Sequence, residues 1–217
     1  MRKLVILLLI VFLVGCTNQK SADINTKEPS AASDETKQII DSSNPLFFLL
    51  ENKDAAPNAK YRYSKLPNLN TETVTMKGNK IKMDLISGII VKDYSTIYLD
   101  SSTKEAFGIC EERKDSVCST TGKVTVLNYD DFAPLTPYYW LEKVPNVAEI
   151  KGTESMNQRQ ATVIEFGYEG KNIRMLIDNF YKLPVKVQVE SGGVKDTYVY
   201  EIVTVGNIKD SDVIAPK

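Results

Sequence analysis

The sequence contains no histidine, only three cysteines and a single tryptophan. Without histidine the chain cannot assemble a Ser-His-Asp or Cys-His catalytic set, and the imidazole ligands that zinc commonly uses are missing. No Lys/Arg-rich run is present and the formal net charge is −1, so nucleic acid is not an expected partner. The sequence therefore predicts a protein that is not an enzyme and holds no cofactor or metal.

The only long apolar stretch lies at the N-terminus, where an unbroken run of 11 residues, Leu4–Val14, follows two basic residues. A helix needs about 20 residues to span the hydrocarbon core, so this run instead fits the apolar region of a secretory signal. It ends in Leu-Val-Gly-Cys, which resembles a bacterial or archaeal lipobox. We therefore predict a signal peptide at 1–15 and a lipid on the thiol of Cys16. The alternative is an uncleaved signal anchor with an incidental cysteine.

Residues 17–44 are rich in Ser, Thr, Asn, Asp, Lys and Ala and contain no aromatic residue. Such a segment buries too little apolar surface to offset the entropy of ordering it. With Cys16 it forms a predicted flexible tether, 16–44, with a mean reach of roughly 30 Å as a random coil. We expect an exported protein, anchored by its N-terminal lipid to the outer face of the cell membrane or in the periplasm, with one folded domain at 45–217.

Within 45–217 the apolar residues recur with period two, which predicts strands. Gly78-Asn79 suits a tight hairpin turn between two such runs, 72–76 and 80–86. Three further hairpins are expected from the same combination of alternation and turn residues: 95–100 with 104–110, 161–168 with 172–178, and 186–190 with 197–205.

Two short helices interrupt this pattern. Ser43 or Asn44 can cap the first, Pro45 suits its first turn, and Phe47 and Phe48 follow. Thr136-Pro137 opens the second, which continues into 138–142. The sequence thus predicts an α+β domain with an antiparallel sheet of about nine or ten strands and two or three short covering helices.

The strands near the C-terminus are expected to be apolar on both faces, with Tyr198, Tyr200 and Ile202 on one face and valines 199, 203 and 205 on the other. A strand in a sheet with one face exposed to water alternates apolar and polar residues, so this pattern indicates that both faces are covered. The sheet is therefore either covered by the aromatic helices or curled around a hydrophobic space. Whether side chains fill that space as an ordinary core is left open.

Cys110 and Cys118 flank a polar segment that reads as an exposed loop. In an exported protein this pair predicts a structural disulfide, worth roughly 2–3 kcal/mol for a closed loop of about nine residues. A metal site needs more ligands than two cysteines, and the Cys-x-x-Cys spacing of a redox pair is absent.

Three short motifs have a possible catalytic or metal-binding interpretation, and each is weak. Ser101–Lys104 matches Ser-x-x-Lys, but it lies in a predicted hairpin turn and lacks the partner motifs. Asp130-Asp131 is expected to begin a turn. Asp210–Asp212 lacks the glycine and the downstream glutamate of a calcium loop, so we expect a solvated turn.

Four segments together resemble the LolA/LolB-like family of lipoprotein-sorting carriers over roughly residues 45–217: 96–100, 152–166, 173–187 and 205–216. The resemblance includes a strand that ends in Ile-Asp, followed after a turn by Leu-Pro and a further strand. It implies a curved antiparallel sheet forming an incomplete β-barrel, with helices as a lid and a cavity that accepts acyl chains. The lipid signal is a departure, because the sorting carrier itself is soluble.

Two functions follow as expectations. The first is an anchored envelope lipoprotein that binds or carries a lipid or other hydrophobic ligand in the half-barrel. Its lining residues would be drawn from the aromatic helices and from two methionines, whose flexible thioethers adapt to variable chains: Phe47, Phe48, Met83, Tyr138, Trp140 and Met175. The alternative is a non-enzymatic interaction or sensor module that uses the barrel as a scaffold and binds a protein partner. A large dry cavity would favour the first function, and a packed interior with an exposed aromatic patch the second.

Overall fold

The computed structural model describes residues 44–67, 71–85, 93–111, 118 and 120–216 of the chain. By its internal contacts the chain divides into residues 1–37 and 38–217, so every described residue belongs to the second unit. The predicted signal peptide, Cys16 and all of the predicted tether except Asn44 lie outside the described residues.

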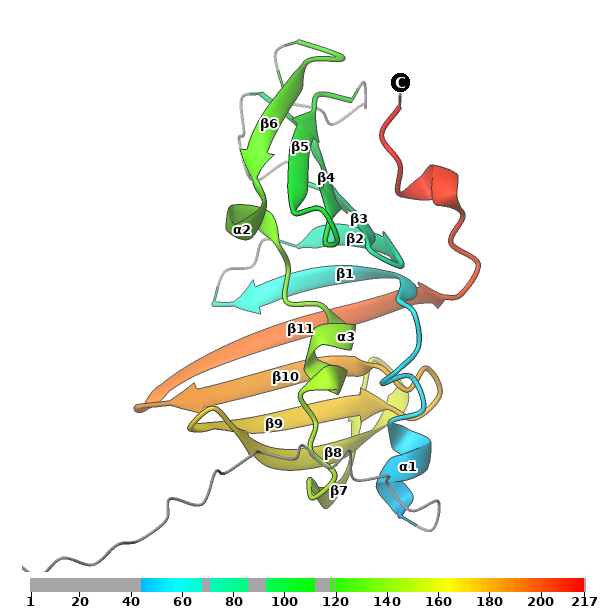
Figure 1. Ribbon diagram of the computed structural model, residues 1–217. Helices are drawn as coiled ribbons and strands as arrows, with labels where there is room; N and C mark the ends of the chain where they lie inside the picture. Colours follow the sequence, from blue (N-terminus) through cyan, green and yellow to red (C-terminus); the bar gives the residue numbers. More distant parts are fainter. Residues whose placement is uncertain (1–43, 68–70, 86–92, 112–117, 119, 217) are drawn as a thin grey trace, which may run out of the picture. The chain divides into compact units, whose positions relative to one another are not determined.

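Eleven strands form a single antiparallel sheet in the order β6-β5-β4-β3-β2-β1-β11-β10-β9-β8-β7 (Figure 1). Their bounds are β1 Asn58–Leu66, β2 Glu72–Lys77, β3 Lys80–Asp84, β4 Thr96–Asp100, β5 Glu105–Ile109, β6 Val124–Asn128, β7 Glu149–Met156, β8 Arg159–Tyr168, β9 Lys171–Asp178, β10 Pro184–Ser191 and β11 Val194–Val205.

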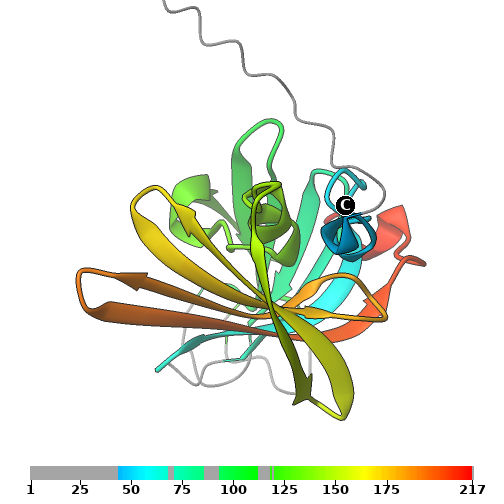
Figure 2. The same cartoon turned by 90° about the horizontal axis from the view of Figure 1, so that it is seen from below.

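The sheet is curved and does not close, because β6 and β7 remain as its two edges (Figure 2). It consists of two meanders, β1–β6 and β7–β11, joined where β1 pairs with β11. The predicted fold class, an α+β domain with an open curved antiparallel sheet, is confirmed. The strand count exceeds the expected nine or ten. The two edge strands β6 and β7 and the central strand β1 are the ones for which the sequence predicted no hairpin.

The predicted hairpins are present, and turn residues with positive φ close them. Gly78, with a φ of 54°, lies in the turn between β2 and β3. The turn between β7 and β8, a hairpin that the sequence did not predict, is formed by Asn157 and Gln158, with φ values of 51° and 63°. Because a two-residue turn of this kind fixes which residues pair across it, these turns set the register of the strands that carry the grooves described below.

The helices are short: α1 Pro45–Leu49, α2 Tyr129–Phe132, α3 Pro137–Glu142 and the 3-10 helix η1 Asp210–Asp212. Asn44 Oδ1 accepts a hydrogen bond from the N–H of Leu46 at 2.9 Å and caps α1, as expected. Thr136 Oγ1 accepts from Tyr139 N at 3.0 Å and caps α3. One correction concerns Asp130-Asp131, which belongs to the first turn of α2 rather than to a plain turn. Carboxylates at that position favourably face the helix dipole.

The main core lies on one face of the sheet, here called the inner face, where α1 and α3 pack (Figure 2). Tyr61 and Tyr200 are its largest fully buried side chains. A smaller cluster of Ala161, Val163, Leu176 and Val185 lies on the opposite, outer face. The β8–β10 part of the sheet thus has apolar contacts on both sides.

The predicted division of faces in β11 is wrong at its C-terminal end. Tyr61 pairs with Ile202 while Lys60 pairs with Thr204, so Val203 is an extra residue opposite β1. Such a bulge reverses the alternation of side chains beyond it. Val205 therefore packs against the main core, and Val203 is 49% exposed.

Candidate functional site

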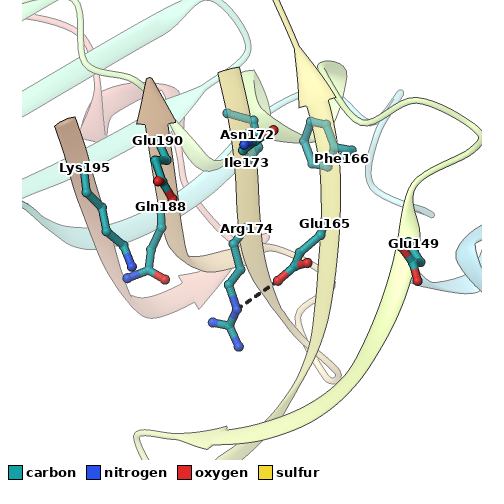
Figure 3. A pocket seen from close by; sticks show the side chains of 9 residues that line it. All are labelled: Glu149, Glu165, Phe166, Asn172, Ile173, Arg174, Gln188, Glu190 and Lys195. Carbon is teal, nitrogen blue, oxygen red and sulfur yellow. Dashed lines mark ion pairs between the residues drawn. The ribbon is translucent and has the colours of Figure 1, made fainter. Parts of the chain in front are cut away.

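An open, largely polar groove lies on the outer face of β8–β11 (Figure 3). Its volume is about 410 Å³. Charged and amide side chains provide most of its walls, with one aromatic and one aliphatic residue at one end. The lining residues are Glu149, Glu165, Phe166, Asn172, Ile173, Arg174, Gln188, Glu190 and Lys195.

The register of three strands brings the floor of this outer groove together. Glu165 of β8 pairs with Arg174 of β9, and Arg174 pairs with Gln188 of β10. The guanidinium of Arg174 lies 3.3 Å from Glu165 Oε1 through its Nε, and it also donates to Glu154 of β7. Because carboxylates from the two neighbouring strands β8 and β7 hold this planar cation, the floor of the groove has a defined arrangement of charge.

The rim of the outer groove carries charges of both signs. Glu190 and Lys195 are paired across the β10–β11 hairpin. In Figure 3 the ends of Lys195 and Gln188 point toward each other, while Glu149 lies on the far side of the groove on β7. An arrangement that offers ammonium, amide and carboxylate groups side by side suits a polar ligand with both donors and acceptors, such as a peptide main chain.

A second, mainly apolar groove of about 400 Å³ lies between α1, β7 and the β9–β10 turn. Helix α1 contributes to one wall and β7 to the other. Thr162 Oγ1 donates to Asn179 Oδ1 at 2.7 Å, which ties the turn to β8. The lining residues of this apolar groove are Pro45, Phe48, Leu49, Ile150, Gly152, Thr153, Thr162, Asn179 and Lys182.

A third groove of about 370 Å³ lies on the outer face of β1–β3, beneath the C-terminal segment. Ile208, whose N–H donates to Asn58 Oδ1 at 3.1 Å, holds that segment in place. Lys77 and Asp210 form an ion pair of 3.0 Å beside it. Its walls are chiefly polar, and it marks the place where the C-terminal segment meets the sheet.

Four of the six predicted ligand-binding residues come together in the main core: Met83, Tyr138, Trp140 and Met175. Their exposed fractions are only 4%, 5%, 5% and 0% respectively. A side chain that lined an open space wide enough for an acyl chain would leave surface accessible to a sphere the size of water. These four side chains fill the core and line none of the three grooves. Ligand binding by them stays a prediction, and the ordinary-core alternative fits their burial better.

The other two predicted residues are on the surface. Phe47 is 44% exposed and Phe48 is 61% exposed, and their rings meet edge to face at 5.5 Å. Phe48 lines the apolar groove. The sequence assigned the same covering and lining role to both aromatic helices. In the structure α1 exposes Phe47 and Phe48, whereas α3 buries Tyr138 and Trp140.

Cys110 and Cys118 are joined by a disulfide, the pairing that the sequence predicted. Cys110 is buried. The predicted lipid site Cys16 lies outside the described residues. Among the residues that the structure describes, no group of three or more Cys, Asp or Glu side chains is placed to hold a metal ion.

A tyrosine-rich region surrounds α3 inside the core. Trp140 Nε1 donates to the hydroxyl of Tyr200 at 2.8 Å, and the ring of Tyr61 meets that of Tyr200 edge to face at 5.7 Å. Burial raises the pKa values of Tyr61 and Tyr200 well above the usual 10.0. Burial likewise raises the pKa of Tyr63 to about 12. All three phenols are thus held in their neutral form, which is the behaviour of a structural core.

Sequence reasoning missed the outer groove, although a signal for it was present. In the predicted strands 161–168, 172–178 and 186–190, the polar residues Glu165, Arg174 and Gln188 alternate with apolar ones. The turn between 161–168 and 172–178 is enough to place Glu165 opposite Arg174. The position of Gln188 opposite Arg174 depends on a register shift between Pro184 and Lys186, which the local pattern does not predict.

No protein-family model and no curated protein matches the chain. Solved structures that it matches include a crystal structure of MucB, with a TM-score of 0.48 and 12% identity over 79% of this chain and 61% of that chain. The complex of MucA and MucB from Pseudomonas aeruginosa matches with a TM-score of 0.44 and 11% identity over 79% of this chain and 59% of that one. The chain thus spans about three fifths of the MucB chains, and likenesses this distant carry no inference about its function.

Proposed function

We propose that the chain is a lipid-anchored interaction module of the cell envelope, and that its outer groove binds a polar, extended segment of a partner protein. The open curved sheet acts as a scaffold in this proposal. No catalytic step is assigned to it.

The observation that carries this proposal is the contrast between the two faces of β8–β10. On the inner face Met175 is fully buried among core side chains, which leaves it no surface for a lipid. On the outer face Arg174, Glu165 and Gln188 form a row in an open groove. Polar groups in fixed positions recognise a polar chain with little ordering cost, whereas an acyl chain would leave them without partners.

The envelope location rests on the lipid signal that ends at Cys16. None of the helices within the described residues has the length and apolar character needed to cross a membrane. In the proposal the lipid at Cys16 supplies attachment, and residues 17–44 provide the reach that lets the domain search for its partner.

Binding of a lipid or other apolar ligand is the second candidate. The apolar groove beside α1 favours it, since Phe48, Leu49 and Ile150 contribute apolar walls to a volume of about 400 Å³. An apolar ligand would sit there on the surface, between α1 and β7, and not inside the curved sheet.

Photo-crosslinking from the rim of the outer groove tests the first candidate. A photoreactive phenylalanine analogue replaces Glu190, which lines the groove, in the full chain expressed in its own cells. We expect a light-dependent adduct with one recurrent polypeptide, digestible by protease. Lys195→Glu, which reverses a charge on the same rim, should remove the adduct because it repels the carboxylates that the lysine would attract.

The matched control carries the photoreactive residue at Glu201. This residue is exposed, forms an ion pair of 3.2 Å with Arg62 and lies outside the lining of the groove. Equal adducts from positions 190 and 201, or an adduct that persists in Lys195→Glu, would contradict groove-specific binding. A lipid adduct from position 48 together with none from position 190 would favour the second candidate.

A further inference from the structure

Exposed apolar side chains gather around the apolar groove and form what we call the aromatic patch: Phe47, Phe48, Ile150 and Phe180. Their exposed fractions are 44%, 61%, 39% and 79%. Phe48 and Ile150 line the groove together with Asn179, the neighbour of Phe180. Asn52 Nδ2, just after α1, donates to the carbonyl of Tyr181 at 2.8 Å, so the β9–β10 turn is fastened beside α1.

Hydrogen bonds to the Asp178 side chain define the conformation of the turn that presents Phe180. Asp178 Oδ1 accepts hydrogen bonds from the N–H groups of Phe180 at 2.9 Å and Tyr181 at 2.7 Å. The turn therefore holds the Phe180 ring in water, where the ring makes no contribution to the core. A large apolar side chain kept exposed on a fixed turn marks an interaction surface.

Cations border the aromatic patch. The guanidinium of Arg159 lies 5.9 Å from the Phe180 ring centre and 4.4 Å from that of Tyr181. Lys182 lines the apolar groove and forms no ion pair with any other residue that the structure describes. The Asp178 carboxylate is occupied by the backbone of the turn. Aromatic side chains beside Arg and Lys are the combination that suits the headgroup region of an anionic bilayer.

We propose that the aromatic patch docks the domain onto the surface of the membrane that holds the lipid at Cys16. This inference rests on the proposed lipid anchor. The docking adds to the anchor a preferred orientation of the domain at the membrane. Only two residues separate Phe47 from the tether, so the patch contains the part of the domain that is nearest to the anchor along the chain. The outer groove lies on the other face of β8 and β9 and stays open to a partner.

A bilayer fits this surface better than a single bound lipid does. The aromatic patch extends beyond the groove to Phe47 and Phe180, which do not line it. One acyl chain in the groove would leave both rings in water, whereas a bilayer surface covers rings on both sides of the groove.

Tryptophan quenching by brominated phospholipid tests the docking. The full lipidated chain carrying Phe48→Trp is reconstituted into vesicles of phosphatidylethanolamine and phosphatidylglycerol with brominated acyl chains. The natural Trp140 is buried, so the added tryptophan dominates the response to contact with lipid. Flotation of the vesicles reports the anchor separately from the quenching.

The matched control is Val126→Trp, on the opposite edge strand β6, where the replaced side chain is 88% exposed. We expect strong quenching at position 48 and little at position 126. Lys182→Glu in the Phe48→Trp chain should reduce quenching on anionic vesicles because it repels the lipid phosphates.

Each outcome separates the claims. A chain that floats without quenching at position 48, or with equal quenching at 48 and 126, overturns the docking and leaves the anchor intact. A chain that does not float overturns the anchor and the docking together. Quenching by monomeric short-chain brominated lipid that equals the quenching on vesicles would show that one lipid occupies the groove, and it would overturn docking on a bilayer.

Discussion

Two neighbouring tyrosines show how chemically identical side chains acquire opposite roles through their surroundings. The hydroxyl of Tyr200 accepts from Trp140 Nε1 at 2.8 Å and donates to the carbonyl of Leu135. The hydroxyl of Tyr61, also fully buried, has no hydrogen-bond partner among the described residues. A buried polar atom without a hydrogen-bond partner lowers the free energy of unfolding. A hydroxyl that bonds two buried neighbours raises it.

These two residues give a matched pair of substitutions. Tyr200→Phe should lower the free energy of unfolding by about 1–3 kcal/mol, because it leaves the indole N–H and a carbonyl unsatisfied. Tyr61→Phe should leave that free energy unchanged or raise it. Urea unfolding of both variants measures the difference. Equal losses in the two variants would contradict the assigned hydrogen bonds.

The raised pKa of Tyr63, about 12 against the usual 10.0, makes stability depend on alkaline pH. Burial is the main cause, and nearby Tyr198 adds to it. Below pH 10 the phenol is protonated in both folded and unfolded chains. Between pH 10 and about 12 only the unfolded chain releases its proton, so the stability falls as the pH rises.

Urea midpoints measured from pH 9 to 12 should therefore decrease less steeply in Tyr63→Phe than in the wild type. A spectrophotometric titration of the phenols supplies an independent check. Parallel curves for the two proteins would show that Tyr63 does not contribute to this dependence.

At the level of residues, the sequence indicated short helices and strands rich in aromatic and methionine side chains. It could not determine which of these side chains lie in the core and which face solvent. Phe48 and Trp140 belong to similar capped, proline-initiated helices, yet Phe48 is 61% exposed and Trp140 only 5%. That difference depends on how each helix lies on the sheet, which is a long-range property.

At the level of elements, local chemistry predicted most of the fold. The caps of α1 and α3 and the four hairpins depend on neighbouring residues, and all are present. Strand β6 and strand β7 were missed, since an edge strand has a partner on one side only and β7 is exposed along most of its length. The bulge at Val203 was also missed, because it arises from pairing with β1, far away in the sequence.

The disulfide between Cys110 and Cys118 should stabilise the end of β5, which ends at Ile109. Replacing both cysteines by alanine should lower the free energy of unfolding by about 2–3 kcal/mol, the loop-entropy value for a short closed loop. Chemical denaturation of oxidised wild type and of the double variant measures the loss. An unchanged midpoint would contradict the predicted stabilisation by the disulfide.

At the level of the molecule, β1 and β11 join two meanders into one open sheet whose faces differ. The inner face is filled by the core with α1 and α3, and the outer face carries the polar groove. The fold class could be predicted because it follows from alternation and turns. The outer groove could not be predicted from the elements alone, since it needs the relative register of β7, β8, β9, β10 and β11.

The anchor is the proposal on which the envelope location depends. Cys16→Ser should release the mature protein from membranes or leave it as the unprocessed precursor, because only the cysteine thiol can receive the lipid. Fractionation of cells followed by intact-mass measurement distinguishes these forms. A Cys16→Ser chain that is still processed and still membrane-bound would be incompatible with lipidation.

Native mass spectrometry of the chain purified gently from its own membranes tests the central claim most directly. The claim is that the sheet interior is a packed core and that a partner polypeptide binds the outer groove. We predict a complex of the chain, bearing its covalent lipid, with a polypeptide of defined mass that is lost in Lys195→Glu. A stoichiometric non-covalent lipid that persists in Lys195→Glu, with no bound polypeptide, would contradict the claim.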